Sequence, residues 1–278
     1  MKMLKIALAQ IKQTNDLEQN GREILRYLDQ SAKAGVQILC FPEAQTAGYR
    51  VDITAPEVPV QVDQLGALHD RVMDFCSRHK IACILGTETP LESDPNHGKP
   101  YNSALVISES GALLGIHHKS KLTPRDAIAY TPGREVGTYP LCGVTVGVAI
   151  CFEGFRFAQT TEECVRQGAQ IVFHPQNNTT QPNDWKIPIH HAMLRTRAAE
   201  NTIWFASCNC AHVPYQNCQT QIVAPNGEIH AECEMKREEL LISDIDVDKA
   251  TRAMFNFDTA DRADLQQLMS YGPEFPGI

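Results

Sequence analysis

The chain has 278 residues, of which 43% are hydrophobic and 21% charged, a composition typical of a globular protein with a sizeable core. Acidic residues outnumber basic ones by 33 to 25, so the net charge is −8, and without any basic cluster this argues against nucleic acid or an anionic membrane as partner. The sequence contains no run of about 18 apolar residues, so no membrane span is predicted. The stretch MKMLKIALAQ lacks the pattern of a signal peptide.

Hydrophobic periodicity predicts helices and strands that alternate in the first half of the chain. Residues 17–35, for example, carry apolar side chains at helical spacing and end on Gly35, a typical helix stop. In chain order we predict a strand at 4–10, a helix at 17–35, a strand at 36–41, a helix at 64–79, a strand at 81–87, a hairpin over 103–119, a strand at 144–150, a helix at 157–168, a strand at 170–174, a helix at 184–201, and strands at 202–208, 219–225 and 238–246.

This order of elements predicts a layered α/β fold. Strands that follow helices favour parallel pairing, and the hairpins make the sheets mixed. No long linker divides the chain. We therefore expect a single domain over residues 1–278, with about 256–278 as a C-terminal tail.

The stretch VGVAICFEG places Cys151 at the end of an apolar strand and just before a predicted helix. A tight turn there exposes the sulfur as a nucleophile, and the backbone N–H of Phe152 is then a natural donor to an oxyanion. The alternative is a buried structural thiol, the commoner fate of a cysteine. The ten cysteines show no paired CxxC spacing, so we expect reduced thiols in a cytoplasmic protein.

Two charged residues also lie at predicted strand ends. Glu43 follows the strand ILCF after Pro42, at the edge of an α/β sheet where active sites form, and Lys119 lies at the end of the second strand of the hairpin. Taken alone, Glu43 is explained equally well as a solvated loop acid, and Lys119 is explained better as an ordinary surface lysine.

In combination, these motifs resemble the carbon–nitrogen hydrolase (nitrilase) superfamily, which has a Glu–Lys–Cys triad in this order. FPE followed by GY, then K-S-K-L, then an apolar strand ending in Cys with an acid two residues later match its pattern. Further matches extend the resemblance from residue 4 to about 245: AGVQILCFPE, TPG at 131–133, GAQIVFHP at 168–175 and RTRAAENTIWFASCN at 195–209. The resemblance implies a four-layer α-β-β-α sandwich and assembly into homodimers or larger homo-oligomers.

The resemblance also implies a mechanism without metal or organic cofactor. Glu43 takes the proton of Cys151, whose sulfur attacks an amide, carbamoyl or nitrile carbon to form a thioester. Lys119 and the N–H of Phe152 stabilise the oxyanion. The charge of Lys119 is also expected to favour the thiolate form of Cys151.

This chain departs from the family pattern at several positions. Asp126 stands where many members carry a second glutamate, and we assign it a supporting role beside Lys119. The family pattern C-x-[DE]-x-R-F fits CFEGFRF only with one inserted residue, so the loop that holds Glu153 and Arg156 is altered. Arg156 is predicted either to bind a substrate carboxylate or to form a salt bridge with Glu153 or a neighbouring acid on the helix.

After the next strand, Gln176 and Asn177 are predicted to line the substrate pocket with amide groups. The leading hypothesis is a small-molecule amidase or N-carbamoyl hydrolase. Nitrile hydrolysis is less favoured, because nitrile-cleaving relatives usually have Trp where this chain has Phe152. Acyl transfer to an amine, and a catalytically inactive binding protein with the same fold, remain as alternatives.

Overall fold

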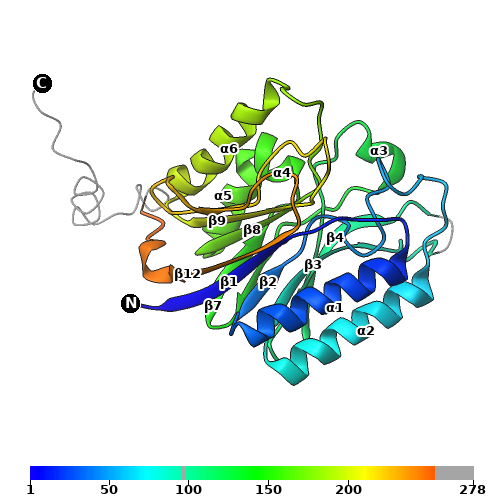
Figure 1. The fold of residues 1–278 in the computed structure, drawn as a ribbon, viewed down its shortest axis with the longest axis horizontal. Helices are drawn as coiled ribbons and strands as arrows, with labels where there is room; N and C mark the ends of the chain where they lie inside the picture. The colour runs from blue at the N-terminus through cyan, green and yellow to red at the C-terminus, as the bar shows by residue number, and fades with distance from the viewer. Residues whose placement is uncertain (96–97, 254–278) are drawn as a thin grey trace, which may run out of the picture.

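The computed structural model describes residues 1–95 and 98–253 (Figure 1). The predicted tail at 256–278 lies outside these residues. Within them, no helix combines the length and the apolar character that crossing a bilayer requires. The helices are α1 (Leu17–Lys33), α2 (Val62–His79), α3 (Asp126–Ala129), α4 (Phe152–Arg156), α5 (Ala158–Arg166), α6 (Lys186–Asn201) and the 3-10 turn η1 (Val247–Lys249).

The first sheet has the strand order β12-β1-β2-β3-β4-β5. Its central strands β1, β2 and β3 are parallel, with Ile6 opposite Ile38 and Ile38 opposite Ala82. Because β4 and β5 then pair in antiparallel fashion, β5 runs in the same direction as β2. The strands are β1 (Met3–Gln10), β2 (Ile38–Cys40), β3 (Ala82–Thr89), β4 (Tyr101–Ile107), β5 (Leu113–His118) and β12 (Glu239–Asp246).

The second sheet repeats this plan in the order β11-β10-β9-β8-β7-β6. Strands β7, β8 and β9 are parallel, and the flanking strands are antiparallel to them. The carboxyl ends of β7 and β8 therefore reach the same edge of the sheet. The strands are β6 (Thr138–Leu141), β7 (Val144–Val148), β8 (Ile171–Gln176), β9 (Trp204–Asn209), β10 (Gln221–Val223) and β11 (Ile229–Glu232).

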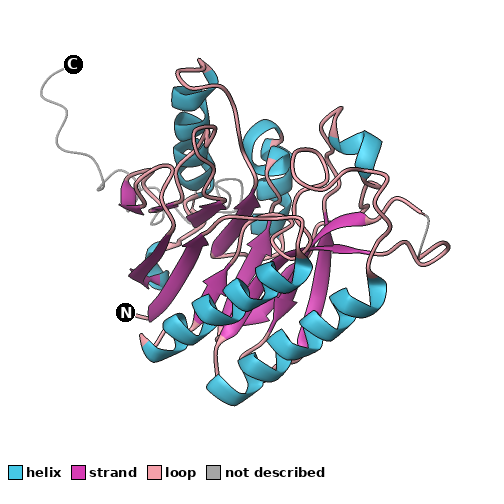
Figure 2. Cartoon of the chain, turned by 45° about the vertical axis from the view of Figure 1, so that its right-hand side comes forward, coloured by secondary structure: helices cyan, strands magenta, loops and turns pink. Residues whose placement is uncertain are grey.

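The two sheets pack face to face, with α1 and α2 outside the first and α5 and α6 outside the second (Figures 1 and 2). Strand β1 shows how its sequence suits this arrangement. Leu4, Ile6 and Leu8 belong to the cluster shared with the second sheet, whereas Ala7 and Ala9 belong to the cluster with α1 and α2. Both faces of the strand are buried, so its sequence is apolar throughout. The predicted α-β-β-α sandwich is confirmed.

The predicted long elements are present, and the differences lie in short ones. The sequence pattern did not predict α3, β6 or α4, none of which has more than five residues. Elements this short contain too few residues for a period of 2 or 3.6 to appear. Strand β2 is also shorter than predicted. At its start, Val36 N–H still donates to Ser31 O in α1, and just beyond its end Pro42 has no N–H to donate to a neighbouring strand.

Candidate active site

The three predicted catalytic residues lie just beyond strand ends. Glu43 follows β2, Lys119 follows β5, and Cys151 lies between β7 and α4. Glu43 and Lys119 come from one sheet and Cys151 from the other. Because β2 and β5 run in the same direction, their ends meet at one edge, and the packing of the sheets brings the third residue to it.

Glu43 is fully buried, and its carboxylate accepts hydrogen bonds from three residues. Oε1 accepts from Lys119 Nζ at 2.7 Å and from Asn102 Nδ2 at 2.7 Å, and Oε2 accepts from the backbone N–H of Asn177 at 2.8 Å. A carboxylate offers about four lone-pair positions, so Oε2 retains one for a further donor.

Lys119 is also fully buried and is shared between two carboxylates. Its Nζ donates to Glu43 and, at 2.9 Å, to Asp126 Oδ2. Tyr49 donates its hydroxyl hydrogen to the other oxygen of Asp126. The shorter side chain of Asp126 therefore still reaches Lys119. An ammonium group has three donor hydrogens, so one remains after these two bonds.

Charge and burial compete at this cluster. Burial alone would lower the pKa of Lys119, but Glu43, Cys151 and Asp126 outweigh it and hold that pKa well above its ordinary value. Burial likewise opposes ionisation of Asp126, yet the Lys119 ammonium and the hydrogen bond from Tyr49 lower its pKa. Lys119 and Asp126 are therefore an ion pair at neutral pH.

Cys151 occupies a strained turn. Its φ of 46° and ψ of −105° lie outside the regions that a residue with a side chain prefers, at a cost of about 1–3 kcal/mol. Four hydrogen bonds of the Cys151 backbone hold the turn. Its N–H donates to Pro175 O at 2.8 Å, and its carbonyl oxygen accepts from His174 Nε2 at 2.8 Å, from Gly154 N–H at 3.0 Å and from Phe155 N–H at 3.2 Å. Since a carbonyl only accepts, the proton of the His174 ring lies on Nε2.

The resting form of the nucleophile is the thiol. Burial raises the pKa of Cys151 well above its ordinary value, and the Glu43 carboxylate, which lies within hydrogen-bonding reach of the thiol, raises it further. Burial also raises the pKa of Glu43, although the Lys119 ammonium opposes this. The Lys119 ammonium does lower the pKa of Cys151, as expected, but burial and the Glu43 carboxylate outweigh this effect.

The residues after Cys151 fall into different surroundings. Phe152 is partly exposed, and its N–H makes no hydrogen bond to any residue in 1–95 or 98–253. Glu153 is fully buried and bonded to groups other than Arg156, so the salt bridge between these two residues does not form. Arg156 is exposed at the end of α4 and has no ion pair with a described residue.

The two amide residues at the end of β8, Gln176 and Asn177, make different contacts. Asn177 belongs to the cluster: besides its N–H bond to Glu43, its Nδ2 donates to Gln13 Oε1 at 2.7 Å. Gln176 instead donates from Nε2 to Ser207 Oγ at 2.6 Å, and so lies with Ser207 rather than with Glu43.

Sequence reasoning missed Asn102 and Tyr49. Asn102 lies in a strand whose remaining residues are mostly apolar, and Tyr49 lies in a loop. Each contacts the cluster only because strand pairing and loop closure bring distant parts of the chain together. No local pattern marks Asn102, whereas Tyr49 belongs to the GY motif but was given no role.

Gly86 allows the segment before Glu43 to approach β3. A Cβ atom at this position would lie 1.8 Å from the carbonyl oxygen of Pro42. The backbone that carries Glu43 could then no longer lie where it does. Only glycine permits this close approach.

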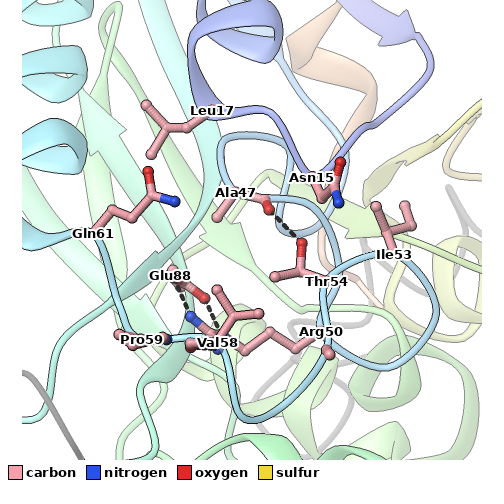
Figure 3. A pocket seen from close by; sticks show the side chains of 11 residues that line it. Asn15, Leu17, Ala47, Arg50, Ile53, Thr54, Val58, Pro59, Gln61 and Glu88 are labelled. Carbon is pink, nitrogen blue, oxygen red and sulfur yellow. Dashed lines mark hydrogen bonds and ion pairs between the residues drawn. The ribbon is translucent and has the colours of Figure 1, made fainter.

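A pocket of about 240 Å³ adjoins the loop that carries Tyr49 (Figure 3). Arg50 and Glu88, both 2% exposed, form a salt bridge at its wall, with Nη2 to Oε1 at 2.7 Å. Arg50 Nη1 also donates to Val58 O at 2.5 Å. The ion pair anchors the loop next to Tyr49. None of Glu43, Lys119 and Cys151 lines this pocket.

The described part of the chain contains no group of three or more His, Cys, Asp or Glu side chains arranged to hold a metal ion. The donor groups around Glu43 are instead bonded to carboxylate and amide oxygens, while Asn102 Oδ1 and Asn177 Oδ1 are buried without a hydrogen-bond partner among the described residues. What the arrangement offers chemically is an acid–base carboxylate, an ammonium donor and a thiol at one sheet edge.

The fold is that of known amidases. A mutant of the amidase from Nesterenkonia sp. AN1, with the acetamide moiety of fluoroacetamide on its active-site cysteine, superimposes with a TM-score of 0.77 at 21% identity, covering 95% of this chain and 96% of that one. A second mutant, in complex with butyramide, gives a TM-score of 0.76 at 22% identity, again covering 95% and 96%.

Residues 5–254 match the family model described as carbon-nitrogen hydrolase, so the chain is a hydrolase that belongs to this family, within the nitrilase superfamily. The omega-amidase NIT2 of Mus musculus is 24% identical over 290 residues, covering 98% of this chain and all of that protein. Nitrilase homolog 2 of Dictyostelium discoideum is 24% identical over 286 residues, covering 97% of this chain and 84% of that protein. The predicted family is confirmed.

Proposed function

We propose that the protein hydrolyses the C–N bond of a small amide or N-carbamoyl compound through a thioester on Cys151. The observation that carries the proposal is the contact of one buried carboxylate with both other members of the triad. Glu43 accepts a hydrogen bond from Lys119 and raises the pKa of the Cys151 thiol within its reach. The names of the relatives, omega-amidase and amidase, support an amide over a nitrile.

In the first half of the reaction, Cys151 Sγ bonds to the substrate carbonyl carbon while its proton passes to the free position on Glu43 Oε2. The carbonyl oxygen becomes an oxyanion. The remaining hydrogen of Lys119 Nζ and the N–H of Phe152 stabilise it. When the C–N bond breaks, Glu43 returns the proton to the departing nitrogen, and the acyl group stays on sulfur.

In the second half, Glu43 removes a proton from a water molecule, whose oxygen attacks the thioester. The S–C bond breaks, the acid product forms, and the sulfur regains its proton. The raised pKa of Glu43 suits this alternation, because a carboxylate of higher pKa is a stronger base. Asp126 holds Lys119 in place throughout, and Asn177 orients Glu43.

We further propose that Arg156, which is exposed and has no ion pair with a described residue, binds a carboxylate group of the substrate. A single domain, a homo-oligomeric assembly and a cytoplasmic location also remain predictions from the sequence.

Intact-mass analysis with a panel of small amides, N-carbamoyl amino acids and nitriles, scored in parallel for ammonia, tests the proposal. We expect ammonia from at least one amide or carbamoyl compound, together with an acyl adduct on Cys151. Ammonia from nitriles alone would identify a nitrilase. The absence of both adduct and ammonia, with Cys151 no more readily alkylated than Cys142, would instead support a binding protein.

An Asp126→Asn variant is expected to shift the acid limb of kcat/KM to lower pH. The charge of Asp126 raises the pKa of Glu43, so its removal lowers that pKa and keeps the base ionised in more acidic solution. We also expect kcat to fall by about tenfold or more, because an uncharged amide holds the Lys119 ammonium more weakly than a carboxylate does. A pH profile of kcat/KM with an unmoved acid limb would contradict the assignment of Glu43 as the base.

A further inference from the structure

We propose that Glu153 and His117 form a positioning pair that joins the loop of Lys119 to the turn of Cys151 and thereby sets kcat. The inference rests on the proposed function, since it concerns the placement of the same lysine and thiol. Neither side chain is assigned a contact with substrate.

Glu153 is fully buried and accepts four hydrogen bonds from two segments of the chain. Oε2 accepts from His117 Nε2 at 2.8 Å and from the N–H of Ile150 at 2.7 Å. Oε1 accepts two hydrogen bonds from Ser120, one from its backbone N–H at 2.6 Å and one from its Oγ at 2.8 Å. Both oxygens are thus occupied within the protein, and none of these bonds is available to a substrate.

The donors and the acceptor flank the reacting residues. His117 and Ser120 lie on either side of Lys119, in the segment that ends β5 of the first sheet. Ile150 and Glu153 lie on either side of Cys151, beyond β7 of the second sheet. One carboxylate therefore joins the segment that holds the ammonium group to the segment that holds the sulfur.

The ionisation of Glu153 favours a link between the two segments that persists at every working pH. Burial by itself would raise the pKa of Glu153, but His117 and the hydrogen bonds from Ile150 and Ser120 lower it to about 2. The carboxylate is therefore ionised wherever the enzyme operates. It also supports a strained turn, because Ile150 N–H is fixed directly before the unusual φ of Cys151.

The link matters for the rate because the oxyanion donors must be in place before charge develops. Displacements of about 1 Å at such a site can lower the rate by about a hundredfold. Lys119 Nζ and the N–H of Phe152 come from the two segments that Glu153 joins. Loosening the link should thus reduce transition-state stabilisation more than substrate binding.

The test compares His117→Leu, His117→Gln and His118→Gln. Leucine removes the donor to Glu153, whereas the glutamine amide can replace Nε2. His118 is the matched control, because its ring contacts Ser103 Oγ at 2.8 Å and stacks on Tyr101 instead. Steady-state kinetics, melting temperature and the iodoacetamide alkylation rate of Cys151 are measured for each, at a temperature where every variant is folded.

For His117→Leu we expect kcat to fall at least about tenfold with KM within about threefold, since a charge-assisted hydrogen bond is lost. His117→Gln and His118→Gln should stay within about threefold of the wild type. Alkylation of Cys151 should change in His117→Leu alone. If His117→Leu does not fold, Ser120→Ala, which removes one bond from a half-exposed hydroxyl, should lower kcat about threefold or more.

A His117→Leu enzyme with kcat within about twofold of the wild type, whatever its melting temperature, would overturn the proposal. So would equal losses in His117→Leu and His117→Gln. If the wild type cleaves no compound of the panel, the proposed function fails separately. The alkylation rates then decide the positioning role, because they need no substrate.

Discussion

A Cys151→Ala variant is expected to lose at least about 10⁴-fold in kcat while remaining folded. The sulfur is the atom that bonds to the substrate carbon in the proposed reaction, and neither Glu43 nor Lys119 can replace it. Removing one sulfur from a small side chain should change the free energy of unfolding by about 1 kcal/mol or less. Ammonia release and urea denaturation measure the two quantities.

Cys142→Ala is the matched control. Of the ten free cysteines, Cys142 is partly exposed and Cys151 is 8% exposed, while the others are almost completely buried. Cys142 is thus the other thiol that a reagent can reach, and its replacement should leave turnover unchanged. A Cys151→Ala enzyme with wild-type turnover would exclude the thioester mechanism.

A Lys119→Met variant is expected to lose both activity and stability. The buried ammonium group compensates Glu43 and Asp126, so its removal leaves two carboxylates without a counter-charge and should cost about 3–5 kcal/mol in the free energy of unfolding. Loss of an oxyanion donor should lower kcat by about 10²–10³-fold. Glu43, the general base, also loses its hydrogen bond from Lys119, which should lower kcat further. Denaturant titration and steady-state kinetics on the identified amide provide both measurements.

The double variant Lys119→Met/Asp126→Asn separates the two effects. It removes one of the uncompensated carboxylates, so part of the lost stability should return. Activity should not return, since the oxyanion donor is still absent. A Lys119→Met enzyme that keeps kcat within about tenfold would show that Lys119 is not an oxyanion donor.

The positions of the catalytic candidates could be predicted because each follows a recognisable strand. ILCF before Glu43, the hairpin before Lys119 and VGVAI before Cys151 are local patterns, and the carboxyl ends of strands in α/β sheets gather at one edge. The family motifs then indicated that the three belong together. The surroundings of these residues could not be predicted in the same way.

Asn102 and His117 illustrate the reason. Asn102 reaches Glu43, 59 residues away, through the pairing of β3 and β4. His117 meets Glu153, 36 residues away, only because β5 of one sheet lies against the turn after β7 of the other. Such contacts depend on which strands pair and how the two sheets pack. The residues adjacent to Asn102 and His117 in the sequence predict neither.

The family, the long helices and strands, and the strand ends at which the acid, the lysine and the thiol lie could all be predicted from sequence, because periodicity and motifs are local properties. The charge states of these three side chains depend on the tertiary structure. Packing the two sheets together buries Glu43, Lys119 and Cys151 in one cluster. The loss of water raises the pKa values of Glu43 and Cys151, and the nearby carboxylates raise that of Lys119 against the effect of burial, so the resting site holds a thiol beside a carboxylate rather than a thiolate.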